Sequence, residues 1–295
     1  MKVAEINGLQ KDFKKVQILK NITMDVYSGE ILGFIGPNGA GKSTTIRILL
    51  GMLRASGGNA KIFGKDSWKE SIAIHSKIAY VPGEVNLWPN LTGGEVIDLF
   101  MNLQGINTES SRKKRLIEKF QFDPSKKIRN YSKGNRQKIA LIVALSSDAD
   151  FFIFDEPTSG LDPLMEVIFQ EEVKEFKSKG KSILLSSHIL SEVEHLCDRV
   201  AIIRQGEVIE TGTLEELRHL TRYEYIVTTQ RKAEILENIS GVYDLSFRRN
   251  QAIFQVGQED VQSVLEALLP YNVVNLESNP PTLEELFLRH YQEKV

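Results

Sequence analysis

The chain begins with strand-like segments and continues with short apolar runs separated by longer helical stretches. A strand candidate lies within Val16–Val26, Ser28-Gly29 favours a turn, and Ile31–Ile35 is a short apolar run. After a glycine-rich loop, Lys42–Leu53 has the length and composition of a helix. The remaining pattern predicts a helix at Pro163–Lys177 and strands at Ile78–Val81, Phe151–Phe154, Ser182–Leu185 and Arg199–Ile203. Strands that alternate with helices favour an α/β fold with a mostly parallel sheet covered on both faces.

The strand signal is lost between residues 92 and 145, where the pattern becomes helical. Thr92 and Glu95 match a capping box, and Ser132 can cap the stretch that leads into Gln137–Leu145. We therefore expect a helical subdomain, at about residues 84–146, inserted between two strands of the sheet.

The chain beyond residue 220 has an order of elements of its own, which predicts two domains, residues 1–220 and residues 221–295. The pattern predicts, in order, a strand at Tyr223–Thr228, a helix at Lys232–Ile239, strands at Val242–Phe247 and Ala252–Val256, a helix at Val261–Leu269 and a strand at Val273–Leu276. This βαββαβ order favours a small α+β module of the ferredoxin-like type. A last amphipathic helix is predicted at Thr282–Tyr291.

Composition narrows the partners and the compartment. The formal net charge of -2 lacks the strongly basic character of a nucleic-acid-binding protein, so we expect no nucleic-acid partner. The single cysteine, Cys197, fits a reducing compartment. There is no apolar stretch long enough to cross a bilayer and no apolar core of a signal peptide, so we expect a cytoplasmic protein. If the protein works at a membrane, another chain must cross it.

A phosphate-binding loop is the strongest chemical signal. The residues Gly36, Pro37, Asn38, Gly39, Ala40, Gly41, Lys42 and Ser43 match GxxxxGK[ST] between a predicted strand and a predicted helix. Glycines let backbone amides approach phosphate oxygens, and the helix N-terminus adds the positive end of its dipole. Lys42 can reach the β- and γ-phosphates of ATP, Ser43 can bind Mg²⁺, and Thr44 continues the loop.

Two carboxylates end the apolar strand at Phe151–Phe154. Asp155 and Glu156 would lie at the carboxyl edge of a parallel sheet, where ligands of such folds bind. Asp155 would hold Mg²⁺, and Glu156 would orient the water that attacks the γ-phosphate. Taken alone, such a sequence is more often an ordinary strand end, but the phosphate loop in the same chain favours the catalytic interpretation.

Three further motifs resemble those of the ABC ATPases. The stretch Tyr131–Gln137 is similar to the family signature, usually Leu-Ser-Gly-Gly-Gln, Ser159–Asp162 looks like the D-loop, and Ser187-His188 looks like the switch histidine. With the phosphate loop and the Asp155-Glu156 pair, they stand in the family's order and cover residues 1 to about 220.

The resemblance implies a P-loop NTPase fold and a set of roles in binding ATP. Two cassettes would enclose ATP between them, so Ser132, Gly134, Asn135 and Asp162 would face the nucleotide of a second copy or of a related ATPase subunit. His188 would contact the γ-phosphate, and Phe13 lies where the family places an aromatic that stacks on adenine. For Phe13, a strand aromatic facing the core is the competing explanation.

The sequence departs from the family pattern at three places. Lys133 and Asn135 replace the usual Gly and Gln of the signature. After the strand Ile78–Val81, the family usually has a glutamine that touches Mg²⁺, whereas this chain reads Pro82-Gly83-Glu84. Glu84 is the nearest oxygen donor, and it is our hypothesis for a substitute metal ligand.

The resemblance also implies a membrane partner. The apolar stretch Leu87–Leu91 lies where the family receives a cytoplasmic helix of an integral-membrane permease, although Trp88 could instead pack inside the helical insert. The tail Pro280–Phe287 resembles those of bacterial drug- and antibiotic-export systems. The expected function is therefore that of an ATP-hydrolysing subunit that powers a transporter, in the direction of export. The alternatives are a soluble ABC ATPase, a regulatory nucleotide-binding module, and a P-loop kinase or GTPase.

Overall fold

The computed structural model describes residues 1–219, 222–257 and 259–279. The chain forms two compact units, Met1–Thr211 and Gly212–Val295. The strands of the first unit form one ten-stranded sheet in the order β5-β4-β1-β2-β10-β9-β3-β8-β7-β6. Their bounds are β1 Lys2–Phe13, β2 Val16–Tyr27, β3 Ile31–Ile35, β4 Gly57–Ile62, β5 Lys65–Asp66, β6 Ile78–Val81, β7 Phe151–Asp155, β8 Ser182–Ser187, β9 Arg199–Arg204 and β10 Glu207–Thr213.

The sheet has a parallel half and an antiparallel half. Strands β9, β3, β8, β7 and β6 pair in parallel, whereas β1 pairs antiparallel with both β2 and β4. The α/β fold is as predicted, and the antiparallel half qualifies the mostly parallel sheet that we expected. Every residue of β3, β7 and β8 is buried, which is typical of parallel strands covered on both faces.

Helices cover both faces of the parallel strands. Helix α1 (Lys42–Leu49) packs between the antiparallel half and β7, and its Ile46 and Leu49 belong to the same apolar cluster as Phe34 of β3. On another side of β3, helix α7 (Leu190–Leu196) comes close at Gly33, where a Cβ atom would lie 2.8 Å from Val193. Helix α6 (Pro163–Ser178) packs on β8, and α2 spans Ser71–His75.

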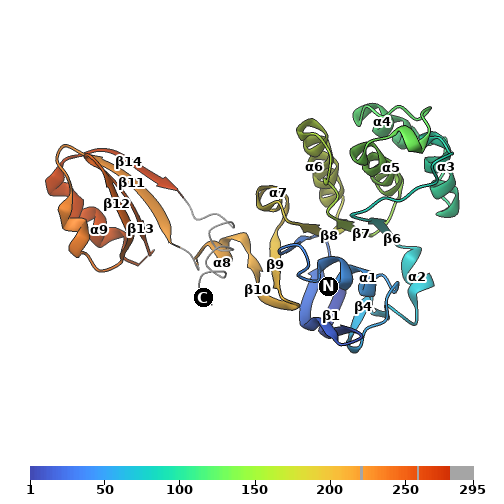
Figure 1. The fold of residues 1–295 in the computed structure, drawn as a ribbon, viewed down its shortest axis with the longest axis horizontal. Coiled ribbons are helices and arrows are strands. Elements are labelled where there is room, and N and C mark those ends of the chain that lie inside the picture. Colours follow the sequence, from blue (N-terminus) through green and yellow to red (C-terminus); the bar gives the residue numbers. More distant parts are fainter. Residues whose placement is uncertain (220–221, 258, 280–295) are drawn as a thin grey trace. The chain divides into compact units, whose positions relative to one another are not determined.

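The insert between β6 and β7 is helical, as the sequence predicts. It contains α3 (Gly93–Leu103), α4 (Ser111–Lys119), the short 3₁₀ helix η1 (Ile128–Asn130) and α5 (Lys133–Ser146), which gather beyond the β6–β7 edge of the sheet (Figure 1). The predicted capping box is present, because Thr92 Oγ1 accepts the Glu95 amide at 3.2 Å and the Glu95 carboxylate accepts the Thr92 amide at 2.7 Å. Ser132 caps α5, as predicted.

Helix α1 ends earlier than the sequence predicts. We expected it to reach Leu53, but it ends at Leu49. The physical reason is Gly51, whose left-handed φ of 68° ends the helix and whose missing Cβ would lie 2.2 Å from the Ser67 carbonyl oxygen. The close approach of a distant segment therefore decides where α1 stops.

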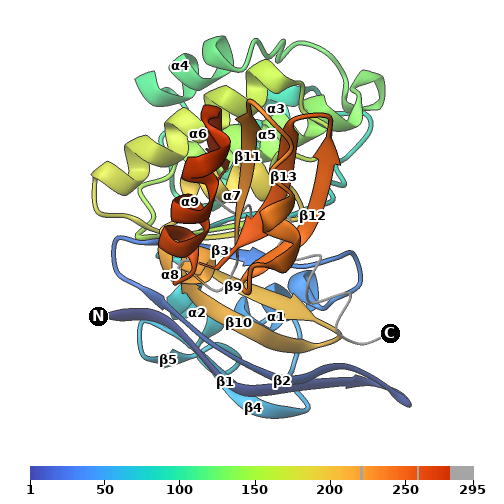
Figure 2. The same cartoon turned by 90° about the vertical axis from the view of Figure 1, so that its left-hand side faces the viewer.

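The strands of the second unit follow the predicted order, with a 3₁₀ turn in place of the first predicted helix. The unit contains α8 (Leu214–His219), β11 (Tyr223–Thr229), η2 (Glu234–Asn238), β12 (Val242–Arg248), β13 (Gln251–Val256), α9 (Val261–Leu268), η3 (Leu269–Tyr271) and β14 (Val273–Asn279). The four strands are ordered β12-β13-β11-β14, and their printed pairings are all antiparallel. Helix α9 lies on one face of this sheet (Figures 1 and 2), where Val264 packs with Phe254 in a small core.

One prediction for this unit is wrong and one falls outside the described residues. The helix expected at Lys232–Ile239 is the 3₁₀ turn η2, because Ala233 has a non-helical backbone (φ -86°, ψ 65°) that delays the turn to Glu234. The amphipathic helix predicted at Thr282–Tyr291 lies outside the described residues. In the described ranges, no helix is long and apolar enough to cross a bilayer.

Candidate functional site

The phosphate loop joins β3 to α1 and exposes its backbone. At Gly36 a Cβ atom would lie 2.3 Å from the Ile203 carbonyl oxygen, so only glycine fits there. Gly41 is the N-cap of α1 with a φ of 116°, and no side chain caps the helix. The first amides of α1 are therefore available to an anionic ligand, as the sequence motif predicts.

Lys42 lies folded over this loop. It is 4% exposed, and its ammonium group donates to the carbonyl oxygens of Gly36 at 2.7 Å and Pro37 at 3.3 Å. The same nitrogen lies 3.5 Å from Glu156 Oε1. A cation and a carboxylate thus meet at the opening of the loop.

The loop forms one wall of a cavity of about 430 Å³. Its lining includes the predicted nucleotide-binding residues Phe13, Asn38, Gly39, Gly41, Lys42, Ser43 and Thr44 and the predicted base Glu156, together with Ile18 and Arg47. Gly36, Pro37 and Ala40 belong to the same loop behind this lining. Phe13 is 45% exposed, so it is not the core aromatic of the competing explanation. Arg47 adds a second cation that we did not predict.

The two carboxylates at the end of β7 differ in their surroundings. Asp155 is 2% exposed and accepts the Ser186 hydroxyl at 2.6 Å. Glu156 faces the cavity from a backbone with a φ of 49°, and its amide donates to the Ser186 carbonyl oxygen at 3.0 Å. A left-handed conformation is unusual for a residue with a side chain, and such strain is concentrated at functional sites.

The predicted switch histidine lies beside Glu156. His188 follows β8, is about half exposed, and places Nδ1 3.4 Å from Glu156 Oε2. Glu156 therefore lies between Lys42 and His188, one on each carboxylate oxygen. The structure brings together, from three distant segments, three groups that the sequence proposes as catalytic.

The predicted signature packs on the predicted D-loop. Gly134 is pressed against Gly160, because a Cβ atom on Gly134 would lie 2.1 Å from the Gly160 carbonyl oxygen. Lys133, which departs from the usual Gly, donates to Ser159 Oγ at 2.7 Å. Asp162 caps α6 by accepting the Met165 amide at 3.1 Å.

The signature does not reach the phosphate cavity of its own chain. Among the described residues, the lining of that cavity does not include Ser132, Gly134, Asn135 or Asp162. Ser132 instead accepts the Asn135 amide at 3.3 Å as the N-cap of α5. The signature and the phosphate loop are thus two separate surfaces of one chain.

The loop after β6 lies against the carboxylates, but Glu84 does not reach the cavity. At Gly83 a Cβ atom would be 3.1 Å from the Asp155 carbonyl oxygen. Glu84 is exposed and is not among the described residues that line the cavity. Its role as a metal ligand therefore stays a prediction. Gln137 of α5 donates to the Pro82 carbonyl oxygen at 3.3 Å, a contact that links the signature helix to this loop.

Sequence reasoning missed the supporting residues of the site. Ser186 and Arg47 lie beside predicted site residues, yet neither belongs to a motif that we used, and Gln137 ends the signature stretch but was given no role in the site. The only available signal was the Ser-Ser pair at the end of β8, directly before His188.

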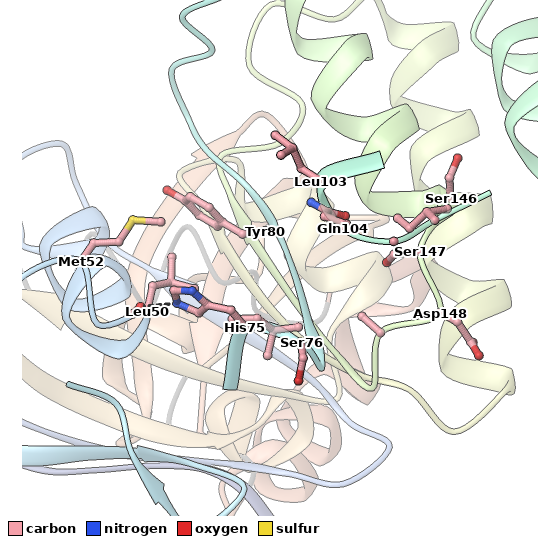
Figure 3. A pocket seen from close by; sticks show the side chains of 14 residues that line it. Leu50, Met52, His75, Ser76, Tyr80, Leu103, Gln104, Ser146, Ser147 and Asp148 are labelled. Carbon is pink, nitrogen blue, oxygen red and sulfur yellow. Dashed lines mark hydrogen bonds between the residues drawn. The ribbon is translucent and has the colours of Figure 1, made fainter. Parts of the chain in front are cut away.

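A second hollow, of about 760 Å³, lies between the end of α1 and the helical insert (Figure 3). Met52, Tyr80 and Leu103 lie around it, with His75 and Ser147 among its polar residues. Burial and the nearby Asp155 raise the pKa of Tyr80 to about 12, so its hydroxyl stays neutral. This groove is lined by both apolar and polar residues and opens to solvent.

Trp88 is 52% exposed, so it is not enclosed by the helical insert. It lies with one side toward Phe100 of α3, at 6.0 Å between ring centroids. The stretch around Trp88 therefore presents apolar surface, as one of our two interpretations expected.

Comparison with known proteins agrees with the resemblance to the ABC ATPases. The family model for ABC transporters matches residues 19–159, and a model described as the C-terminal domain of DrrA1-3-like ATP-binding proteins matches residues 212–291. The linearmycin resistance ATP-binding protein LnrL of Bacillus subtilis is 31% identical, over 96% of this chain and 96% of its own length. The ABC transporter ATP-binding protein NatA of the same organism is 37% identical, over 72% of this chain and 88% of its own length.

Solved structures agree with the fold. The structure of an ATP-binding subunit of an ABC transporter is 32% identical, with a TM-score of 0.68 over 74% of this chain and 92% of that one. A dimeric post-hydrolysis cassette bound to ADP and phosphate has a TM-score of 0.65 at 23% identity, over 72% of this chain and 98% of that one. With the phosphate loop, the Asp155-Glu156 pair and His188 in one site, the chain belongs to the ATP-binding, ATP-hydrolysing subunits of ABC transporters.

Proposed function

We propose that ATP hydrolysis in this chain depends on three side chains at the opening of the phosphate cavity. Lys42 holds the β- and γ-phosphates, Glu156 positions and polarises the attacking water, and His188 contacts the γ-phosphate. The observation that carries this proposal is the position of the Glu156 carboxylate, 3.5 Å from Lys42 Nζ and 3.4 Å from His188 Nδ1. Phe13 stacks on the adenine, and the amides of the loop bind the phosphates.

The oxygen donors present at the site fit Mg²⁺. Ser43 lines the cavity at the first turn of α1, and Asp155 is a buried carboxylate whose position is fixed by the Ser186 hydroxyl. Hydroxyl and carboxylate oxygens are the ligands that Mg²⁺ prefers in phosphate sites. We propose that Ser43 and Asp155 hold the ion, and Glu84, which lies outside the cavity lining, remains our hypothesis for a further oxygen donor. When bound, the ion neutralises charge on the phosphate oxygens.

A second ATPase subunit completes the site. Because Ser132, Gly134 and Asn135 lie outside the cavity of their own chain, we propose that they face the ATP of another copy or of a related subunit. Asp162 accompanies them at that interface through the contact between Gly134 and Gly160. In this proposal the cassette is residues 1–220, and residues 221–295 form an accessory module.

The membrane partner is an integral-membrane permease. We propose that the groove in Figure 3 receives a cytoplasmic helix of that permease, since apolar side chains such as Met52 and Leu103 line it. The protein would then work in the cytoplasm at the inner face of the membrane. The direction of transport is export, which the DrrA-like C-terminal domain and the linearmycin resistance relative support.

Phosphate release by the full-length chain tests this proposal. We expect Glu156→Gln to lower turnover by about 10²–10⁴-fold, because a positioned base contributes that much. Glu194→Gln, the same change on α7, is the matched control and should keep the wild-type rate. If Glu156→Gln hydrolysed ATP as fast as the control, Glu156 would not be the base. Co-purification with a polytopic membrane protein tests the partner, and recovery of soluble partners alone would contradict a transporter.

A further inference from the structure

A buried carboxyl group behind the site has no role in the mechanism above. Glu192 lies on α7, four residues after His188, and it is only 4% exposed. Its Oε1 atom is buried and has no hydrogen-bond partner among the described residues. Burying an ionisable group costs several kcal/mol, and an apolar residue would pack α7 without that cost. Glu192 therefore needs an explanation other than packing.

The carboxyl group is bonded to the loop that carries His188. Ser187 Oγ donates to Glu192 Oε2 at 2.7 Å, and Ser187 Oγ also accepts a hydrogen bond from the Ile189 amide at 3.0 Å. The Ser187 hydroxyl thus links the two neighbours of His188 to each other and to Glu192. A hydroxyl has one hydrogen, and the competing acceptor, the Ile189 carbonyl oxygen, is farther away at 3.5 Å. The protonation state of Glu192 therefore decides which of the two acceptors binds the Ser187 hydrogen.

The same carboxyl group also interacts with the segment before the D-loop. The Thr158 hydroxyl lowers the pKa of Glu192, and Thr158 is only 4% exposed. The Thr158 carbonyl oxygen in turn accepts the Leu161 amide at 2.9 Å, which closes the D-loop turn. The carboxyl group is therefore bonded to the loop of His188 and interacts electrostatically with the segment before the D-loop.

We propose that Glu192 is a positioning residue that holds His188 beside Glu156, and that its protonation loosens the loop and slows ATP turnover. This inference rests on the proposed catalytic roles of Glu156 and His188. The ionised carboxylate accepts the Ser187 hydrogen and leaves a lone pair of Ser187 Oγ for the Ile189 amide. Protonation removes the charge from this hydrogen bond and weakens it, so the Ser187 hydrogen can turn to the Ile189 carbonyl oxygen and Ser187 is held less firmly.

The charges around Glu192 place this change near neutral pH. Burial raises the pKa of Glu192 to about 7, against the lowering effect of the Ser187 and Thr158 hydroxyls, and Glu166 of α6 raises it further. Cys197, the C-cap residue of α7, interacts electrostatically with Glu192, and burial raises the pKa of its thiol well above the usual value, so the thiol stays neutral. The carboxyl group is thus neutral below about pH 7 and ionised above it.

The test compares pH profiles of ATP turnover for full-length wild type, Glu192→Gln and the control Glu194→Gln. Wild type and control should show kcat rising as pH increases through about 7. Glu192→Gln should lose this rise and turn over about tenfold more slowly at high pH, the value of one charge-assisted hydrogen bond. Its KM for ATP should stay within about twofold of wild type, since the phosphate cavity is untouched.

Hydrogen exchange at the Ile189 amide, measured by NMR, reports how firmly the loop is held and does not depend on ATP hydrolysis. Protection of this amide should fall in wild type as Glu192 is protonated and should not depend on pH in Glu192→Gln beyond intrinsic exchange. Ser187→Ala combined with Glu192→Gln should be no slower than either single variant, because both break one chain of bonds.

Three outcomes would overturn the positioning role. The kcat of Glu192→Gln could rise with pH as it does in wild type, or the losses of the two single variants could add in the double variant. The protection of the Ile189 amide in wild type could also prove independent of pH. A wild-type chain with no turnover that depends on Glu156 would instead contradict the proposed function. The exchange measurement would still decide the role of Glu192.

Discussion

The contact between Gly134 and Gly160 gives a prediction whose size follows from the structure. A Cβ atom at residue 134 would lie 2.1 Å from the Gly160 carbonyl oxygen and 3.1 Å from its carbonyl carbon. A carbon and a carbonyl oxygen rarely approach closer than about 3.3 Å. In Gly134→Ala the signature and the D-loop must therefore separate by about 1 Å. The Cβ position is fixed by the backbone and the Gly160 carbonyl is itself a backbone group, so no side-chain rotation can relieve the contact.

This displacement should slow hydrolysis about 100-fold. A misplacement of about 1 Å in a catalytic arrangement can cost that factor, and the signature serves ATP bound by a second subunit. Binding of ATP to the isolated chain should be unchanged, since Gly134 lies outside the phosphate cavity. Helix α5 itself should not suffer, because alanine favours a helix by up to about 1 kcal/mol relative to glycine.

The assay is steady-state phosphate release, with equilibrium binding of a fluorescent ATP analogue and thermal unfolding measured on the same samples. Gly257→Ala is the matched control, because a Cβ atom there would meet nothing closer than 3.7 Å and would not strain the chain. If Gly134→Ala turned over ATP at the rate of Gly257→Ala, the close packing of signature on D-loop would be irrelevant to hydrolysis. A loss of analogue binding would also refute the separation of the two surfaces.

Three other predictions concern the metal, the buried carboxyl group and the second unit. Glu84→Ala should weaken the apparent Mg²⁺ affinity of turnover about tenfold, and an unchanged Mg²⁺ titration would rule Glu84 out as a ligand. The pKa of Glu192 is raised from 4.5 to about 7, so wild type loses stability as pH rises between those values. Glu192→Gln should therefore gain up to about 3 kcal/mol over wild type above that window and little below it, as thermal unfolding at about pH 4 and pH 8 would show; an equal effect at both pH values would contradict the linkage. Phe254 is 1% exposed in the small core beside β11 and β13, so Phe254→Ala should destabilise the second unit by about 3–5 kcal/mol in denaturant unfolding of the full chain. A loss below about 1 kcal/mol would show that this core does not stabilise the unit.

Much of the site could be predicted because its chemistry is contiguous in sequence. The turn from β3 to α1 needs glycines and a lysine at fixed spacing, and backbone amides bind phosphate wherever such a turn occurs. The capping box of Thr92 and Glu95 is likewise local, so it was predictable from two residues. The order of the strands and the position of helix α9 in the second unit were predictable from hydrophobic periodicity.

Elements with weak local signals were missed. Strand β4 (Gly57–Ile62) starts with two glycines, and its residues become a strand because they pair with β1. Helix α1 ends at Leu49 since Gly51 meets the Ser67 carbonyl oxygen, a contact between segments that the sequence does not place together. Pairing and close approach depend on partners far along the chain, which a window of sequence cannot contain.

The sequence by itself determined which groups bind phosphate and which carry charge at the ends of buried strands. Only the tertiary structure decided that Glu156 stands between Lys42 and His188, that Ser186 holds Asp155, and that Glu192 supports the loop behind them. The physical reason is one of range. Turn geometry, caps and periodicity are set by neighbouring residues, whereas hydrogen bonds between β7, β8 and α7 exist only after the parallel strands have been brought into register.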